Sequence, residues 1–347
     1  MKKTLVTLLQ AAVTIGILAW LFRNPETNRQ MWAALTQAHT GWIVLAALAF
    51  GVAEIFGVAR WRLLLKVQGI TVGWLRLLGL VLIGLFFNVF MPGGTGGDVV
   101  KIFYLLKETP GRKPAAVLAA MVDRIVGLMA LILLAAVVIV LRYDWLTSTP
   151  VTSGLLYTLM TIFGSALAFV FISFGLTASG LVHRLPARLP LREKLIEMSV
   201  AYRLYARAWR STLAALLISL PVHFLSFVQF YFVARAFSAA AGKVSLLDFS
   251  ALMPIVNTLT AMPISIGGAG LREGLFVRLL GDLCGIDAAT ATVISLTGYL
   301  VIALGGLVGG VIYLCYRPSN AGRGVSSGGE DATVQGSPFG PSEVPSK

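Results

Sequence analysis

Apolar runs long enough to cross a membrane recur along almost the whole of this 347-residue chain. A transmembrane helix needs about 20 predominantly apolar residues, within a range of roughly 17 to 25. Charged residues make up only 12% of the chain, whereas soluble domains carry about 25%. The eight apolar segments are Leu5–Phe22, Trp42–Val58, Leu75–Met91, Ala115–Leu141, Leu155–Ala178, Leu213–Phe237, Leu252–Ile266 and Ala288–Tyr316. We therefore expect an all-α polytopic membrane protein, which excludes a nucleic-acid-binding module, a cytosolic enzyme and a disordered scaffold.

The two ends of the chain differ from the apolar region between them. Lys2 and Lys3 precede the first apolar run, and no small-residue cleavage site follows it, so we expect a retained first span rather than a signal peptide. From about residue 318 the composition switches to Ser, Gly and Pro, which predicts a disordered tail. We expect a membrane domain over 1–317 and a disordered cytoplasmic tail over 318–347.

The basic residues decide between two topologies, because cytoplasmic loops carry an excess of Lys and Arg. If all eight segments crossed, the stretches Lys101–Lys113 and Arg184–Arg210 would lie outside with eleven positive charges between them. If Leu75–Lys107 and Leu252–Leu280 instead enter the membrane and return to the same side, those charges become cytoplasmic. We therefore predict six full spans plus two re-entrant helical hairpins, with both termini on the cytoplasmic side of the plasma or inner membrane.

This topology contains an internal symmetry. The two halves, about 1–150 and 151–317, both consist of span, span, hairpin and span, but in opposite orientations. Such an inverted-topology repeat is the plan of many secondary transporters. A trace of it remains in the sequence, because the motif M-P-x-x-x-G-G begins at both Met91 and Met262.

The two motifs are predicted to break the helices in which they occur. Proline lacks a backbone donor and glycine permits positive φ, so each motif should end a half-helix and leave backbone N–H groups free to attract an anion. The alternative is that the glycines only permit close helix packing. The substrate-binding candidates at the breaks are Pro92, Gly96, Gly97, Pro263, Gly267 and Gly268.

Ionisable residues within the apolar segments are the second signal, since each is costly to place at the centre of a bilayer. They are Glu54, Asp98, Asp123, Arg124 and Glu273, with Lys101 after the first break and Arg272 beside Glu273. The partners open to Asp123 are Arg272 and Lys101, and those open to Arg124 are Glu54, Asp98 and Glu273. A set of static ion pairs within the bundle is the alternative to a substrate site.

We expect the four charges Asp123, Arg124, Arg272 and Glu273 to share one site near mid-membrane, because gathering opposite charges around one polar cavity lowers their cost. Either arginine would meet a lipid phosphate, while either carboxylate would hold an arginine or carry a proton. The candidates for coupling to protons or cations are Glu54, Asp123 and Glu273.

Three other features favour structural interpretations. His223, which follows Pro221, is typical of a packed and hydrogen-bonded residue. Arg60-Trp61-Arg62 is typical of snorkelling arginines and an interfacial tryptophan at the end of a span. Leu191–Arg210 has the pattern of an amphipathic helix on the cytoplasmic leaflet, with a linker helix packed against its own bundle as the alternative.

Four ordered motifs resemble a known family. They are Arg60-Trp61-Arg62-Leu63-Leu64-Leu65; Asn88 followed by Met91-Pro92-Gly93-Gly94-Thr95-Gly96-Gly97-Asp98; Asp123-Arg124-Ile125-Val126-Gly127-Leu128; and Pro263-Ile264-Ser265-Ile266-Gly267-Gly268-Ala269-Gly270-Leu271-Arg272-Glu273. The chain resembles the lysylphosphatidylglycerol synthase transmembrane family, a flippase-like domain, up to about Arg317. Lys101 is a departure, because relatives often carry Arg there.

This resemblance implies a stand-alone protein that translocates lipid, and it adds Asn88 to the substrate-binding candidates. In bifunctional members the domain is followed by a cytosolic aminoacyltransferase, which we do not expect here because the thirty residues given after Arg317 are mostly polar. The implied substrate is an anionic or aminoacylated phospholipid or a polyprenyl-type lipid.

Two other function classes compete with a flippase. An intramembrane aspartyl protease is disfavoured because Thr95 spoils the G-x-G-D pattern at Asp98. The other alternative is that the protein does not transport lipid but is a partner of a separately encoded lipid-modifying enzyme. The motif G-x-x-x-x-G-K-[ST] is absent, so we do not expect this chain to use ATP. Cys284 and Cys315 lie far apart, and we expect no metal, no cofactor and no nucleic acid.

Overall fold

The computed structural model describes residues 12, 14–17, 19, 22–90, 96–109, 112–178, 192–262 and 264–316, and these residues contain helices and no strands. Five of the helices are long and apolar enough to cross a membrane. They are α3 (Thr40–Val67), α6 (Lys113–Leu146), α7 (Pro150–Ala178), α10 (Trp209–Arg235) and α14 (Ala288–Cys315). The prediction of an all-α polytopic membrane fold is therefore confirmed. The first predicted span, Leu5–Phe22, lies largely outside the described residues.

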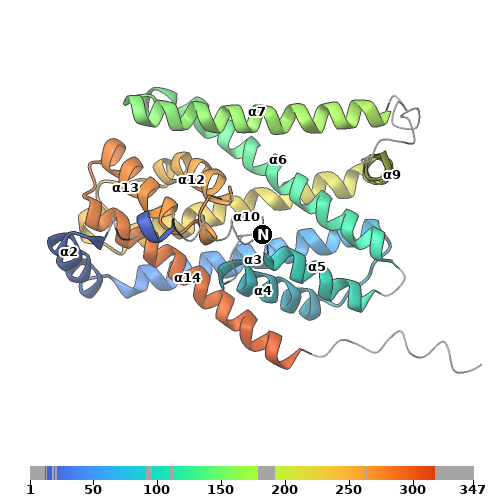
Figure 1. Cartoon of the computed structure of the whole chain (residues 1–347), viewed down its shortest axis with the longest axis horizontal. Coiled ribbons are helices and arrows are strands. Elements are labelled where there is room, and N and C mark those ends of the chain that lie inside the picture. Colours follow the sequence, from blue (N-terminus) through green and yellow to red (C-terminus); the bar gives the residue numbers. More distant parts are fainter. Residues whose placement is uncertain are drawn as a thin grey trace, which may run out of the picture.

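Two pairs of shorter helices lie where the sequence predicts hairpins (Figure 1). The first pair is α4 (Trp74–Phe90) with α5 (Gly96–Glu108), and the second is α12 (Leu246–Ala261) with α13 (Leu271–Cys284). The 17 residues of α4 and the 16 of α12 rise only about 24 to 26 Å, which is less than the roughly 30 Å hydrocarbon core of a bilayer. Their length suits hairpins that enter a membrane without crossing it, and the number of full crossings stays a prediction.

Local sequence signals explain where several helices begin. The short helix α2 (Pro25–Thr36) has Pro at its first position, and Asn24 Oδ1 accepts a hydrogen bond from the Glu26 N–H at 3.0 Å. A reciprocal capping box between Ser245 and Asp248 starts α12. At the start of α14, Asp287 Oδ1 accepts from the Thr290 N–H at 2.9 Å. These caps satisfy backbone N–H groups in the first turns and so fix where α2, α12 and α14 begin.

The helix α9 (Arg192–Arg207) forms within the predicted amphipathic segment. Its Tyr205 is buried, and the hydroxyl donates to the carbonyl oxygen of Leu64 in α3 at 3.0 Å. Burial raises the pKa of Tyr205 to about 12, so the hydroxyl stays a donor at neutral pH. This end of α9 therefore packs against the bundle, as in the linker-helix alternative. Contact between α9 and a leaflet stays a prediction.

One packing contact joins two of the long helices, and another holds the first hairpin against the last long helix. The helix α10 lies along α3, and α14 crosses α4 (Figure 1). A Cβ at Gly309 of α14 would collide with the carbonyl oxygen of Leu82 in α4, and one at Gly310 would lie 2.8 Å from the Phe86 ring. The two backbones can approach closely because these α14 positions have no side chain. The first hairpin is therefore packed directly against the last long helix.

Candidate functional site

A cavity of about 570 Å³ is lined by residues of α3, α4, α5, α6 and α10 together with Ala261 of α12. The charged and polar residues that line it are Glu54, Arg60, Asn88, Asp98, Lys101, Asp123, Arg124 and His223. Positions three or four residues apart share one face of a helix, and this spacing brings the lining together. Glu54 and Gly57 present one face of α3 to the cavity, and Asp123 and Gly127 present one face of α6.

A bidentate ion pair joins α3 to α6 inside this cavity. The Arg60 guanidinium donates from Nε to Asp123 Oδ1 at 2.7 Å and from Nη2 to Asp123 Oδ2 at 3.1 Å. A third bond runs from Nη1 to the hydroxyl of Ser219 in α10 at 3.3 Å. Gly127 leaves room for the guanidinium, since a Cβ at that position would lie 3.3 Å from Nη1. One arginine thus connects three long helices.

The predictions for Arg60 and Asp123 were wrong. The helix α3 continues to Val67, so Arg60 and Trp61 lie within it and line the cavity, and Arg60 is held by Asp123 instead of snorkelling. Asp123 pairs with Arg60 and not with Arg272 or Lys101. Apolar-run counting ended this span at Val58 because two arginines follow, yet a paired arginine is compatible with a helix that continues.

A second group of charges connects α5 with α6. Asp98, in the first turn of α5, forms ion pairs with Arg124 and with the Lys101 Nζ, the latter at 3.8 Å. Of the three partners predicted for Arg124, the structure thus selects Asp98. The Lys101 Nζ also lies 4.4 Å from the ring centroid of Trp61, within cation–π range. The Arg124 side chain is 63% exposed and that of Lys101 only 14%, so Arg124 lies at the mouth of the cavity and Lys101 within it.

Two neutral polar side chains, Asn88 and His223, also line the cavity. Asn88 Oδ1 accepts from the backbone N–H of Gly97 at 2.9 Å. Gly97 is a point of close approach, because a Cβ there would collide with the carbonyl oxygen of Gly84. His223 Nε2 lies 2.9 Å from the carbonyl oxygen of Gly127. Since a carbonyl only accepts, Nε2 is the donor. His223 is hydrogen-bonded, as predicted, and its position in the cavity lining was not anticipated.

Glu54 is the third carboxylate of the cavity lining. In the parts of the chain that the structure describes, its side chain forms no hydrogen bond and no ion pair, unlike those of Asp98 and Asp123. Arg60 and Lys101 are the cations that interact with it electrostatically. An unpaired carboxylate in such a cavity is unusual, because buried charges are normally paired.

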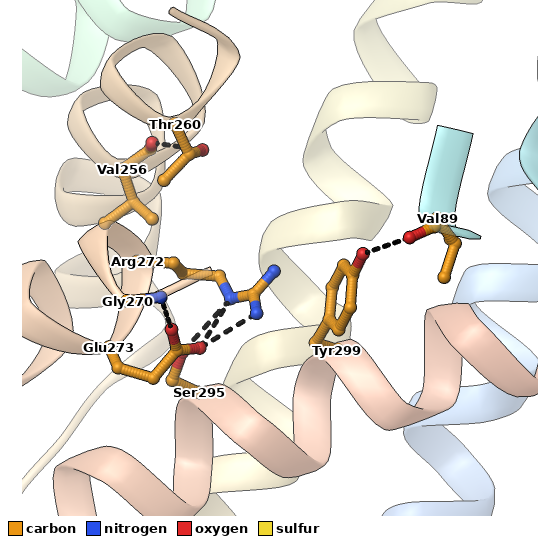
Figure 2. Close-up of polar contacts among 8 residues, drawn as sticks. All are labelled: Val89, Val256, Thr260, Gly270, Arg272, Glu273, Ser295 and Tyr299. Carbon is orange, nitrogen blue, oxygen red and sulfur yellow. Dashed lines mark hydrogen bonds and ion pairs between the residues drawn. The ribbon is translucent and has the colours of Figure 1, made fainter. Parts of the chain in front are cut away.

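Arg272 and Glu273 form a separate cluster at the start of α13, shown in Figure 2. The Arg272 Nη2 donates to Glu273 Oε1 at 2.8 Å, and the Arg272 Nε donates to the hydroxyl of Ser295 in α14 at 3.2 Å. Glu273 Oε2 accepts from the Gly270 N–H at 2.6 Å, which caps α13. The Glu273 side chain is only 1% exposed. The carboxylate therefore holds the arginine and the helix start together.

The four charges that we expected in one site thus divide between two clusters. Asp123 and Arg124 line the cavity. Arg272 and Glu273 are not among the described residues that line it. Tyr299 of α14 joins the second cluster to α4. The Arg272 guanidinium carbon is 3.8 Å from the centroid of its ring, and its hydroxyl donates to the carbonyl oxygen of Val89 in α4 at 3.3 Å (Figure 2). Each pair has its ion-pair partners on its nearest helices, so no described ion pair joins the two clusters.

The predicted helix breaks are confirmed where the structure describes them. Between α12 and α13, Gly267, Gly268 and Gly270 all have positive φ, which only glycine adopts without strain. A Cβ at Gly268 would also lie 2.9 Å from that of Thr260. Gly96 and Gly97 instead form the first helical positions of α5. Pro92 and Pro263 lie outside the described residues.

Among the charged, aromatic and polar members of the cavity lining, sequence reasoning missed Arg60, Trp61 and His223 as site residues. For α3 the sequence did contain a signal. Ala53, Gly57 and Trp61 are spaced by four residues, so the helix face beside Glu54 continues beyond the end of the apolar run at Val58. No comparable signal marked His223. Across the described residues, no group of three or more His, Cys, Asp or Glu side chains is placed to hold a metal ion.

Comparison with known proteins agrees with the resemblance carried by the four motifs. A family model described as the lysylphosphatidylglycerol synthase TM region matches residues 7–310. The chain is also similar to the UPF0104 membrane protein PH1989 of Pyrococcus horikoshii, with 28% identity over 134 residues. That match covers 38% of this chain and 38% of that relative.

Proposed function

We propose, because this chain belongs to the family of lysylphosphatidylglycerol synthase TM regions, that it moves a membrane lipid with a phosphate-containing headgroup between the two leaflets. The observation that supports this most directly is the charged cavity among five helices, with Arg124 exposed at its mouth. The substrate class includes anionic and aminoacylated phospholipids and polyprenyl-type lipids, whose shared recognition element is the phosphate.

The cations of the cavity retain donors for such a phosphate. An arginine has five N–H donors, and only part of this capacity is used by one carboxylate. Arg124 is paired with Asp98 alone among described side chains, and the Lys101 Nζ is 3.8 Å from the same carboxylate. A phosphate that enters at Arg124 can therefore bind both cations, with bidentate contacts to the guanidinium. Asn88 and His223 offer further polar contacts to the rest of a headgroup.

The same proposal places the protein as a multi-pass component of the plasma or inner membrane, with both termini in the cytoplasm. Its energy source is not ATP bound by this chain, since the phosphate-binding motif G-x-x-x-x-G-K-[ST] is absent from the sequence. Transport is then either downhill or coupled to another gradient. No catalytic role is proposed for the cavity.

The test is a leaflet-exchange assay on the full chain in vesicles that contain phosphatidylglycerol labelled on one acyl chain. A membrane-impermeant reductant quenches only the label in the outer leaflet, so exchange appears as loss of the protected fraction. We expect the protein to speed exchange over protein-free vesicles, and Arg124→Ala to lower that rate about tenfold, which corresponds to ~1.4 kcal/mol in the transport barrier.

Arg278→Ala is the matched control, because Arg278 also forms an ion pair, with Asp282 at 3.1 Å, but lies outside the cavity lining. It should exchange lipid at the wild-type rate. If the wild-type protein is no faster than protein-free vesicles with this lipid, with an aminoacylated phospholipid and with a polyprenyl phosphate, the proposal fails. The chain would then fit a non-transporting partner of a lipid-modifying enzyme.

A further inference from the structure

The charges that line the cavity balance one another. Three side chains are cationic, namely Arg60, Lys101 and Arg124, and three are carboxylates, namely Glu54, Asp98 and Asp123. With every carboxylate ionised and His223 neutral, the lining has no net charge. A phosphate diester that enters this cavity therefore adds one negative charge that no side chain offsets, and an unbalanced charge in a poorly solvated site is costly.

The charged and polar groups that line the cavity with Glu54 come from five helices, while α12 contributes only Ala261. Arg60 lies on its own helix, α3, and Asn88 on α4. Asp98 and Lys101 lie on α5, Asp123 and Arg124 on α6, and His223 on α10. Asp123 is held by two hydrogen bonds from Arg60, and Asp98 by ion pairs with Arg124 and Lys101. Among the described residues that line the cavity, Glu54 is the carboxylate that forms no ion pair with a cation.

The other candidates for proton coupling are held too firmly to change their charge. Protonation of Asp123 would leave the Arg60 guanidinium without a carboxylate, and protonation of Glu273 would do the same to Arg272. Removing one partner of a buried ion pair costs about 3 to 5 kcal/mol. Protonation of Glu54 breaks no ion pair among the described residues, so of these carboxylates it changes the structure least.

On the basis of the proposed function, we propose that Glu54 is a proton-binding site that couples the uptake of one proton to the entry of one anionic lipid headgroup. A proton from the aqueous phase forms an O–H bond on the Glu54 carboxylate, which becomes a neutral acid. The lining then carries one net positive charge, and the phosphate diester neutralises it. When the headgroup leaves toward the other leaflet, the proton is released to water on that side, so the step moves no net charge.

This coupling makes a quantitative prediction for vesicles that hold a pH gradient. When one proton moves with each lipid, the ratio of lipid between the leaflets follows the ratio of proton concentrations across the membrane. One pH unit should therefore enrich phosphatidylglycerol about tenfold in the leaflet that faces the alkaline side, since each tenfold ratio is ~1.4 kcal/mol. Protein-free vesicles under the same gradient provide the baseline.

The variant Glu54→Gln keeps the size of the side chain and removes its charge. Whatever its exchange rate, we expect its phosphatidylglycerol to reach a leaflet ratio near one under the same gradient. Glu26→Gln is the matched control, because Glu26 is an exposed carboxylate at the start of α2 and lies outside the cavity. This control should keep the tenfold response. Labelled phosphatidylcholine, whose headgroup has no net charge, should show no enrichment with the wild-type protein.

The possible results separate the coupling from the proposed function. If the wild-type protein exchanges phosphatidylglycerol but the gradient leaves the leaflets equal, the coupling is overturned and translocation stands. Enrichment driven by a sodium gradient at equal pH, or a pH response that survives Glu54→Gln and disappears in His223→Gln, also overturns it. If the wild-type protein exchanges none of the lipids, the proposed function itself fails.

Discussion

The guanidinium of Arg60 is fixed at three points, by the two carboxylate oxygens of Asp123 and by the hydroxyl of Ser219. Both side chains of the ion pair are largely buried. Such a pair adds little to stability compared with apolar packing, but removing one partner leaves a buried charge uncompensated. Its contribution is therefore the placement of α3, α6 and α10 around the cavity.

Asp123→Asn should destabilise the protein in detergent by about 3 kcal/mol, because the Arg60 charge loses its carboxylate. Adding Arg60→Gln should recover part of that loss, since neither side of the contact is then charged. Thermal or denaturant unfolding of the two single variants and the double variant measures the coupling. Strictly additive losses would show that the ion pair does not govern the placement of these helices.

Gly97→Ala should reduce folded protein and lipid exchange together, since a Cβ at this position collides with the carbonyl oxygen of Gly84. Gly51→Ala is the control, because no atom lies within 4 Å of a Cβ built at Gly51. Yield of monodisperse protein and the exchange rate per folded molecule are the two readouts. Loss of exchange with normal folding would return Gly97 to the role of a substrate contact.

At the scale of single residues, the sequence predicts which residues carry charge in the membrane but not which of them form ion pairs. Asp98 was among the partners open to Arg124 because both are ionisable residues within apolar segments. The pairing of Asp123 with Arg60 was missed, because the arginine lies beyond the apparent end of an apolar run. Contacts between helices depend on how each helix is rotated and shifted along its axis, and hydropathy does not report either quantity.

Among the elements, the two hairpins are joined by one side chain of the last long helix. Tyr299 stacks on the Arg272 guanidinium beside the second hairpin and donates to the Val89 carbonyl oxygen at the end of α4. Ile266, in the loop of the second hairpin, donates its N–H to the Thr14 hydroxyl at 2.9 Å. The end of each hairpin is thus tied to a neighbouring segment instead of being free.

Tyr299→Phe should lower stability by about 1 kcal/mol, the usual net value of one hydrogen bond, while keeping the aromatic ring over Arg272. The loss of stability should be local, so amide hydrogen exchange should increase at the end of α4 and the start of α5. Tyr143→Phe is the matched control, because its hydroxyl bonds the Tyr157 hydroxyl at 3.2 Å on an exposed surface. Unchanged exchange in α4 of Tyr299→Phe would contradict a link between the hairpins.

The hairpins themselves could be predicted from the sequence, since a Pro-Gly break within a short apolar run leaves two helices too short to cross a bilayer. The residues at which the helices begin and end were harder to predict from the sequence. The segment predicted as Trp42–Val58 is part of a helix that covers Thr40–Val67, and the second hairpin begins at Leu246, set by the Ser245 cap. Composition reveals the apolar centre of an element, while caps and buried ion pairs set its ends.

On the scale of the whole molecule, the distribution of basic residues gives a topology that labelling can test. A single cysteine near Gly111, in a background without Cys284 and Cys315, should react with an impermeant thiol reagent only from the cytoplasmic side. A cysteine near Lys243 should react only from the outside. Both results follow from keeping the basic stretches 101–113 and 184–210 cytoplasmic. An external Gly111 would contradict the first re-entrant hairpin and the inverted repeat.

The close approach of Gly309 to Leu82 has a consequence for how the chain is made. A ribosome produces α4 well before α14, and at 5 to 20 residues per second the intervening stretch takes roughly 10 to 45 s to synthesise. During that interval the nascent first hairpin lacks the helix that covers its backbone, so lipid or an insertion factor must occupy that face. A polypeptide released before Gly309 retains the uncovered face permanently. Arrival of the last long helix therefore completes the packing of a hairpin that was made long before it.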